Sequence, residues 1–125
     1  MPDAGNPVGI RLCHAADIPE GGACGFNSQG YGGVFAVRRN GVVRVWRDRC
    51  PHVGSPLPWR KDAYLNAARD RIVCAAHGAH FEVETGLCIL GACLGQSLEA
   101  VPFVLTLEGQ IVVIEHPHEM RGKIS

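Results

Sequence analysis

Short runs of apolar residues, separated by glycine, proline and asparagine, recur along the chain. The clearest pair is VFAVRR (34–39) and VVRVWRD (42–48), which flank Asn40-Gly41. An Asn-Gly pair between two β-branched runs predicts a β-hairpin, because both residues of such a tight turn take positive φ. The second strand of this hairpin is expected to end at Asp48, just before Cys50.

Four other segments carry strand patterns. A first strand is expected over 8–13 and a short one over 71–74. Segment 79–90 reads as strand, Thr85-Gly86 turn and strand, and segment 101–115 reads as a closing hairpin around Glu108-Gly109. Short strands at close spacing predict an all-β fold.

The remaining segments are expected to lie outside strands. Pro19, Gly21 and Gly22 indicate a turn. Segment 61–70 (KDAYLNAARD) permits one or two turns of helix, and segment 91–100 reads as a loop. The polar end, 116–125, is expected to fray.

Composition narrows the class of protein. The chain has 125 residues, 46% of them hydrophobic and 19% charged, which predicts a single domain over 1–125 with a real core. A formal net charge of zero argues against a nucleic-acid-binding surface. No apolar run is long enough to span a membrane, and the first residues do not resemble a secretory signal. We therefore expect a cytoplasmic protein, in which cysteines serve as ligands or free thiols rather than disulfides.

Two cysteine–histidine pairs stand out against this background. Cys50 and His52 are separated by one proline, and Cys74 and His77 are separated by two alanines. Each pair follows a predicted strand, and each is followed by a glycine, Gly54 or Gly78. A loop that wraps closely around a metal needs the unusual backbone angles that glycine adopts most easily.

Two metal centres could use two cysteines and two histidines. Structural zinc sites include a Cys₂His₂ set, but their usual spacing pairs cysteine with cysteine and histidine with histidine. Here each loop contributes one of each. That arrangement fits a [2Fe–2S] cluster in which one iron takes two cysteines and the other takes two histidines.

The segments CPHVGSPL (50–57) and CAAHGAHF (74–81) resemble the two cluster-binding boxes of Rieske proteins, Cys-x-His-x-Gly and Cys-x-x-His-Gly. The similarity extends to ADIPEGG (16–22) and to HGAHFEVETGLCILG (77–91), and covers most of the chain, about 11–114. The resemblance implies the Rieske fold of stacked small antiparallel sheets, with a cluster-binding subdomain of two loops at about 48–96. It also implies that Cys50 and Cys74 bind one iron and that His52 and His77 bind the other.

The resemblance also bears on the reduction potential. High-potential respiratory members carry a second cysteine in each box, and these form a disulfide; this chain has Ser55 and Ala76 there. They also place a hydroxyl-bearing serine and tyrosine where this chain has Ala79 and Phe81, which cannot donate hydrogen bonds from their side chains. We therefore expect a low-potential, ferredoxin-type centre.

Several other residues could carry chemistry. Cys88 and Cys93 could form a small disulfide, place a thiol beside the cluster, or act as small apolar fillers, which is the interpretation we favour. Cys13 and Cys24 are expected to be core or strand residues. His80 is expected to point away from the cluster on a strand.

The aromatic residues and the end of the chain complete the set of candidates. Trp46 is expected to pack in the core; Trp59 could pack there or form part of a docking face. EHPHE (115–119) offers two histidines and two glutamates, but its context favours a solvated end.

The resemblance implies an electron-transfer protein rather than an enzyme. We expect a monomeric carrier that passes single electrons between a reductase and an acceptor, such as a Rieske non-haem iron oxygenase. The alternative is a tightly bound subunit or redox sensor within a larger enzyme, similar to the small subunit of a nitrite reductase. A self-contained oxygenase is disfavoured because 125 residues leave no room for a second, catalytic domain.

Overall fold

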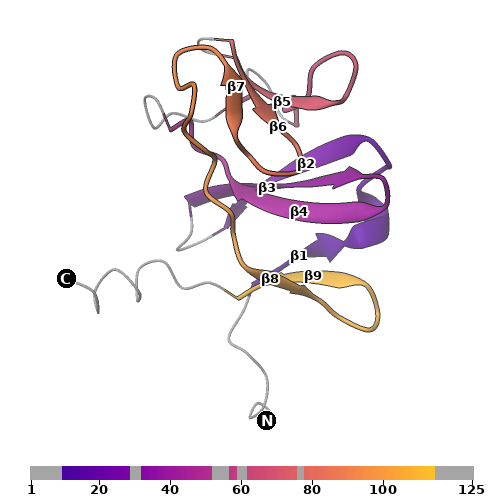
Figure 1. Ribbon diagram of the computed structural model, residues 1–125. Coiled ribbons are helices and arrows are strands. Elements are labelled where there is room, and N and C mark those ends of the chain that lie inside the picture. The colour runs from indigo at the N-terminus through magenta and orange to yellow at the C-terminus, as the bar shows by residue number, and fades with distance from the viewer. Residues whose placement is uncertain (1–9, 29–31, 52–56, 59–61, 76–77, 115–125) are drawn as a thin grey trace, which may run out of the picture.

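The computed structural model describes residues 10–28, 32–51, 57–58, 62–75 and 78–114. These residues form three antiparallel sheets of three strands each, stacked one above another (Figure 1). Apart from one short 3₁₀ turn, η1 (Ala15–Asp17), this part of the chain contains no helix, and so none that could cross a membrane. The predicted all-β fold of stacked small sheets is confirmed.

The lower sheet in Figure 1 joins the two ends of the described chain. Its strands are β1 (Ile10–His14), β8 (Phe103–Leu105) and β9 (Gln110–Val113), in the order β1-β9-β8. The predicted closing hairpin is therefore present, and Gly109 takes the left-handed conformation at its turn, with φ 89°. The predicted first strand is also present from Ile10 onward; Val8 and Gly9 lie outside the described residues.

The middle sheet contains the predicted Asn-Gly hairpin. Its strands are β2 (Gly22–Ser28), β3 (Gly32–Arg39) and β4 (Val42–Arg47). Asn40 and Gly41 both have positive φ, 55° and 75°, as the turn requires. Strand β4 ends at Arg47, one residue earlier than expected.

Strand β2 was missed by the sequence analysis, which assigned only a turn near its start. Its glycines lower the local preference for a strand, yet it pairs with β3 from Gly22↔Arg38 to Ser28↔Gly32. A tertiary contact explains why position 25 is a glycine, because a β-carbon there would collide with the hydroxyl of Tyr64. Glycine in this strand thus makes room for a side chain 39 positions later in the sequence.

The upper sheet carries the second cysteine–histidine pair. Its strands are β5 (Arg71–Cys74), β6 (Ala79–Glu82) and β7 (Cys88–Leu90). Both predicted segments are confirmed, including the turn at Gly86, where φ is 76°.

The helical turns permitted by segment 61–70 do not form in its described part, residues 62–70. Asp62 and Arg69 both have positive φ, which an α-helix does not allow. The backbone runs beside β5 instead, because Val73 donates a hydrogen bond to the carbonyl of Tyr64 at 2.8 Å. A bridge between Leu65 and Ile72 extends this pairing. Tertiary pairing with β5 therefore outweighs the local helix preference.

The middle sheet is covered on both faces, so the core has two layers. Along β3, Phe35 and Val37 face the upper layer, whereas Val34 and Ala36 face the lower one. A strand buried on both faces reads as a continuous apolar run, and β3 does so. The upper layer packs the middle sheet against β5, β6 and β7, and it includes Trp46, which is 6% exposed. The expectation that Trp46 is a packing residue is confirmed.

Gly86 tests how tightly the upper layer is packed. A β-carbon at Gly86 would lie 2.7 Å from the indole of Trp46, and its φ is in the left-handed region. Gly86→Ala is expected to lower the free energy of unfolding by about 3 kcal/mol, since it adds overpacking to backbone strain. Urea denaturation of the anaerobic protein would measure this loss.

Gly41→Ala is the matched control. Its φ of 75° is nearly the same, but a β-carbon there meets no atom within 4 Å. This variant should lose only about 1–2 kcal/mol, the cost of backbone strain. Equal losses in the two variants would contradict the packing argument.

Candidate metal centre

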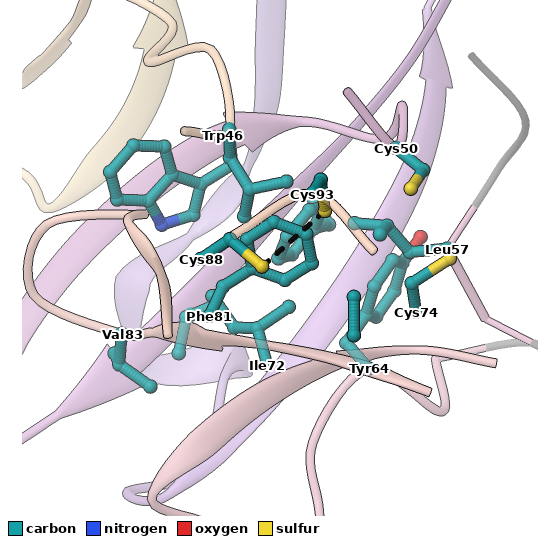
Figure 2. Packing of buried hydrophobic residues seen from close by; sticks show 14 residues of the cluster. Trp46, Cys50, Leu57, Tyr64, Ile72, Cys74, Phe81, Val83, Cys88 and Cys93 are labelled. Carbon is teal, nitrogen blue, oxygen red and sulfur yellow. Dashed lines mark hydrogen bonds between the residues drawn. The ribbon is translucent and has the colours of Figure 1, made fainter. Parts of the chain in front are cut away.

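The two predicted cysteine ligands lie in one buried place. Cys50 follows β4, and Cys74 is the last residue of β5. Their exposed fractions are 1% and 0%, and both belong to the upper core layer. Figure 2 shows the two side chains at the same end of this layer, beside Leu57. His52 and His77 lie outside the described residues, so the structure places half of the predicted ligand set.

The loops that carry these cysteines are joined through Asp48. Its backbone N–H donates to the carbonyl of Gly33 at 3.0 Å, which holds the residue against β3. Its Oδ1 accepts a hydrogen bond from the backbone N–H of Leu57 at 2.7 Å. The carbonyl of Leu57 in turn accepts from the N–H of Ala75 at 2.8 Å. Ala75 directly follows Cys74, so one chain of contacts ties the first loop to the second.

Tyr64 completes this network and was not found by the sequence analysis. Its hydroxyl donates to Oδ2 of Asp48 at 2.7 Å, and its ring stacks on Phe35 with centroids 4.1 Å apart. Burial, followed by the hydrogen bond to Asp48, raises the pKa of Tyr64 above its ordinary value. The phenol therefore stays protonated and remains a donor. No local sequence signal reveals this role, because Tyr64 lies in the segment read as helical turns.

The second loop turns back at Gly78. This residue has φ 71°, and its N–H donates to the carbonyl of Cys74 at 2.8 Å. A β-carbon there would meet nothing within 4 Å, so the backbone conformation alone favours glycine. The expectation of an unusual glycine conformation is confirmed for Gly78; Gly54 lies outside the described residues.

Cys88 and Cys93 lie beside the predicted ligands rather than apart from them. Both are buried free thiols of the upper core layer, with Sγ atoms 3.4 Å apart. The Cys93 thiol donates to the sulfur of Cys88, and Cys50 belongs to the same core layer. Burial, and then the neighbouring sulfurs of Cys88 and Cys50, raise the pKa of Cys93 to about 12. The pair thus fills core space, as expected, and also places thiols next to Cys50.

The other candidates lie away from this place. Along β6, Ala79 and Phe81 face the upper core layer, so His80 lies on the opposite face, as expected. Cys13 and Cys24 are half-buried and pack against the lower layer, which confirms them as strand residues. Trp59 and segment 115–119 lie outside the described residues.

In the part of the chain that the structure describes, no three His, Cys, Asp or Glu side chains form a group able to hold a metal. The two described cysteines do fit half of a mixed-ligand iron–sulfur site. They are buried in the same core layer, and their sulfurs are the soft ligands that such clusters use.

Comparison with known proteins identifies the class. The family model of the Rieske [2Fe–2S] domain matches residues 9–108, and this chain belongs to that family. Its cofactor is accordingly a [2Fe–2S] cluster. This excludes the zinc centre that the four residues alone had left open.

The curated relatives are much longer than this chain. Apoptosis-inducing factor 3 of Mus musculus and of Homo sapiens are each 34% identical to it over 79 residues, or 63% of the chain. The match spans 12% of either relative's own length.

The fold agrees with solved Rieske structures. The ferredoxin of carbazole 1,9a-dioxygenase from Nocardioides aromaticivorans IC177 has a TM-score of 0.66 and 24% identity. The match covers 84% of this chain and 95% of the ferredoxin. A chain in the reduced complex between oxygenase and ferredoxin in carbazole 1,9a-dioxygenase has a TM-score of 0.68 and 20% identity, with coverages of 85% and 28%. These likenesses establish the Rieske fold.

Removal of the Tyr64 hydroxyl tests the network that joins the loops. Tyr64→Phe keeps the ring that stacks on Phe35 but leaves Asp48 with one donor fewer. We expect a loss of about 1–3 kcal/mol in the free energy of unfolding, because the lost hydrogen bond was made to a carboxylate. Urea denaturation of both proteins at neutral pH would measure it.

The pH dependence gives the same test a second readout. Above pH 10, the ordinary pKa of tyrosine, the unfolded chain loses the Tyr64 proton while the folded chain keeps it. Stability should therefore fall as the pH rises past 10, and it should fall less steeply in Tyr64→Phe. Parallel pH profiles for the two proteins would contradict the assigned role.

Proposed function

We propose that this chain is an electron carrier that passes single electrons from a reductase to an acceptor enzyme. The observation that carries the proposal is the pairing of two buried cysteines on loops joined through Asp48 and Leu57. Membership of the Rieske [2Fe–2S] family supports electron transfer rather than catalysis by the chain itself.

Within this proposal, Cys50 and Cys74 hold one iron, and His52 and His77 hold the other. The bound cluster supplies a centre that takes up and releases one electron. The two thiolates bring negative charge to their iron, whereas two neutral imidazoles bring none. The histidine side is therefore the easier one to reduce.

The proposed acceptor is a Rieske non-haem iron oxygenase. Solved structures similar to this chain include a complex of reduced oxygenase and oxidized ferredoxin in carbazole 1,9a-dioxygenase. This supports an acceptor of the same chemical class. A separate reductase would supply the electrons to this chain. The protein is proposed to act as a monomer in the cytoplasm.

A tightly bound subunit or redox sensor is the second candidate. Leu87, Leu90 and Leu94 are exposed by 38%, 51% and 66%. Leu87 directly precedes β7, Leu90 is its last residue, and Leu94 lies on the loop after it. This loop carries Cys93, so the apolar surface lies on a segment that also reaches the core layer of Cys50. An apolar surface there would suit a permanent contact with a larger enzyme.

Ligand substitutions test the proposed site. Cys50→Ser and Cys74→Ser should each lose most of the iron, inorganic sulfide and visible colour of the anaerobically prepared protein. His77→Cys should keep iron but lower the midpoint potential, because it replaces a neutral ligand by a charged one. Iron and sulfide analysis, with the EPR spectrum of the reduced protein, would measure these effects.

Cys13→Ser and Cys24→Ser are the matched controls. Both residues pack against the lower core layer, away from the proposed ligands, and both variants should keep the cluster. Full iron content in Cys74→Ser would refute the ligand set.

The carrier role predicts reversible one-electron cycling at low potential. Ala79 and Phe81 lie buried in the upper core layer, and neither offers a hydroxyl to the cluster sulfurs. The midpoint is therefore expected below roughly 0 mV, in the lower part of the Rieske range. An anaerobic redox titration would measure it.

Hydrodynamics separates the two candidate functions. A free carrier should elute as a monomer and should be reduced by a generic ferredoxin reductase and then reoxidised in solution. Elution only in complex with a larger protein would favour the bound subunit, and a midpoint well above 0 mV would contradict the low-potential assignment.

A further inference from the structure

Cys88 and Cys93 form a close pair of thiols that the proposed ligand set does not use. The thiol of Cys93 donates a hydrogen bond to the sulfur of Cys88, with the two Sγ atoms 3.4 Å apart (Figure 2). A disulfide bond joins sulfurs about 2.05 Å apart, so this pair has about 1.4 Å to close. Both are free cysteines, exposed by 1% and 0%. The two sulfurs are therefore already neighbours in the reduced chain.

The backbone places these two residues opposite each other in a short closed loop. The N–H of Cys88 donates to the carbonyl of Gln96 at 2.7 Å, and the N–H of Gly95 donates to the carbonyl of Cys88 at 3.2 Å. Gly91, with φ 110°, turns the chain between the two cysteines. Cys93 is thereby directed inward, onto Cys88.

Segment 91–97 lies at the surface and is anchored in the core by one side chain. All of its residues are described, and only Cys93 among them is buried. The hydrogen bond from the N–H of Leu94 to the carbonyl of Gly91 is long, at 3.2 Å. Segments with few buried apolar contacts open locally at a fraction of the global unfolding free energy. Opening exposes Cys93 first, because Cys88 lies on β7 and is paired within the upper sheet.

We propose that Cys88 and Cys93 are a reversible dithiol–disulfide site, oxidised by exchange with a small organic disulfide such as oxidised glutathione. The carrying observation is the contact between two free thiols beneath a surface segment. This role goes beyond electron transfer by the cluster, and it does not depend on which residues bind the cluster.

The exchange has two steps. In the open segment the Cys93 thiol loses its proton, and its thiolate attacks one sulfur of the small disulfide; that S–S bond breaks, and one small thiolate leaves and takes up a proton. Cys88 then loses its proton, attacks the sulfur of Cys93 in the mixed disulfide and expels the second small thiolate, which is protonated in turn. The two cysteines together lose two electrons and two protons, and the small disulfide gains both to give two thiols. While the segment is closed, the buried thiols keep their protons and do not react.

Oxidation would close a covalent ring beneath an apolar surface. The ring contains Leu90, and Leu94 directly follows it; these side chains are exposed by 51% and 66%. Ring closure removes conformations that the open segment otherwise adopts. The oxidation state of the pair therefore controls how readily this apolar segment opens.

The test treats the anaerobic, cluster-loaded protein with excess oxidised glutathione and stops the reaction with acid. After denaturation and alkylation, four of the six cysteines should be alkylated, because two are held in the disulfide. Cleavage after glutamate releases segment 85–99, which contains only Cys88 and Cys93. This peptide should be unalkylated and lighter by two hydrogen atoms, while the visible spectrum of the cluster persists. Dithiothreitol should restore all six thiols.

Hydrogen exchange gives a readout of the restrained segment. The backbone amides of residues 91–96 should exchange several-fold more slowly in the oxidised protein than in the reduced one. Unchanged exchange would contradict the control of opening by the disulfide.

Three variants separate the roles of the two thiols. Cys88→Ser keeps the thiol that opens to solvent but lacks the second one, so a mixed disulfide with glutathione should accumulate on Cys93. Cys93→Ser should react at least tenfold more slowly at Cys88. Cys13→Ser is the matched control, since Cys13 packs against the lower core layer, and it should form the disulfide at the wild-type rate. The wild-type experiment needs no substitution and decides alone if a variant does not fold.

Two results would overturn the proposal. One is a segment 85–99 that stays fully reduced in the folded protein under conditions that oxidise the urea-unfolded chain, because the pair is then inert. The other is a disulfide to Cys50 or Cys74 that appears as the cluster colour is lost.

These results are distinct from failure of the proposed function. If Cys50→Ser keeps a full cluster, the ligand set is wrong, and the disulfide in segment 85–99 should still form. If Cys50→Ser loses the cluster and segment 85–99 of the wild type stays reduced, the ligand set stands and the dithiol site alone fails.

Discussion

The carboxylate of Asp48 connects the middle sheet to both loops of the candidate metal centre. It is held against β3 by its own backbone, accepts hydrogen bonds from Leu57 and Tyr64, and reaches the second loop through Leu57 and Ala75. A carboxylate with two short donors is well satisfied, but the loss of either leaves a half-buried carboxylate with one donor fewer. The relative position of Cys50 and Cys74 therefore depends on a residue that binds no metal.

Burial of the middle sheet on both faces determines where the centre can lie. Because Phe35 and Val37 cover the upper side of β3, the space between this sheet and the upper one is apolar. The cysteines enter that space from its end. In such surroundings a hydrogen bond to a charged sulfur is stronger than in water, so a single donor can alter the energy of reduction. Cys93 lies buried in this same layer.

The loop that carries Cys93 extends from the upper core layer to the surface. Its inward residue, Cys93, donates a hydrogen bond to Cys88 in the core, while Leu94, the next residue, is 66% exposed. A partner that packed on Leu94 would press on the segment that holds the thiol in place. The exposed apolar surface and the buried thiols of the upper core layer therefore share one short segment.

Local sequence accounts for the hairpins, the strands of the upper sheet and both cysteines. Turn glycines, β-branched runs and ligand spacing are patterns of a few neighbouring residues. The turn at Asn40-Gly41, the backbone conformation of Gly78 and the strand at 71–74 could therefore be predicted from the sequence alone. The two segments that resemble the Rieske cluster-binding boxes predicted the family, and the match to the family model confirmed it.

Local sequence did not reveal strand β2, the role of Tyr64, or the placement of Cys93 in the same core layer as Cys50. Gly25 is explained only by a ring packed against it, and Tyr64 only by a carboxylate 16 positions earlier. Cys93 lies 43 positions after Cys50 and shares a core layer with it, and Gly91 allows its loop to pack closely on Ala79. Interactions within a turn or a strand are encoded by neighbouring residues, whereas a contact between distant segments exists only once the sheets have packed together.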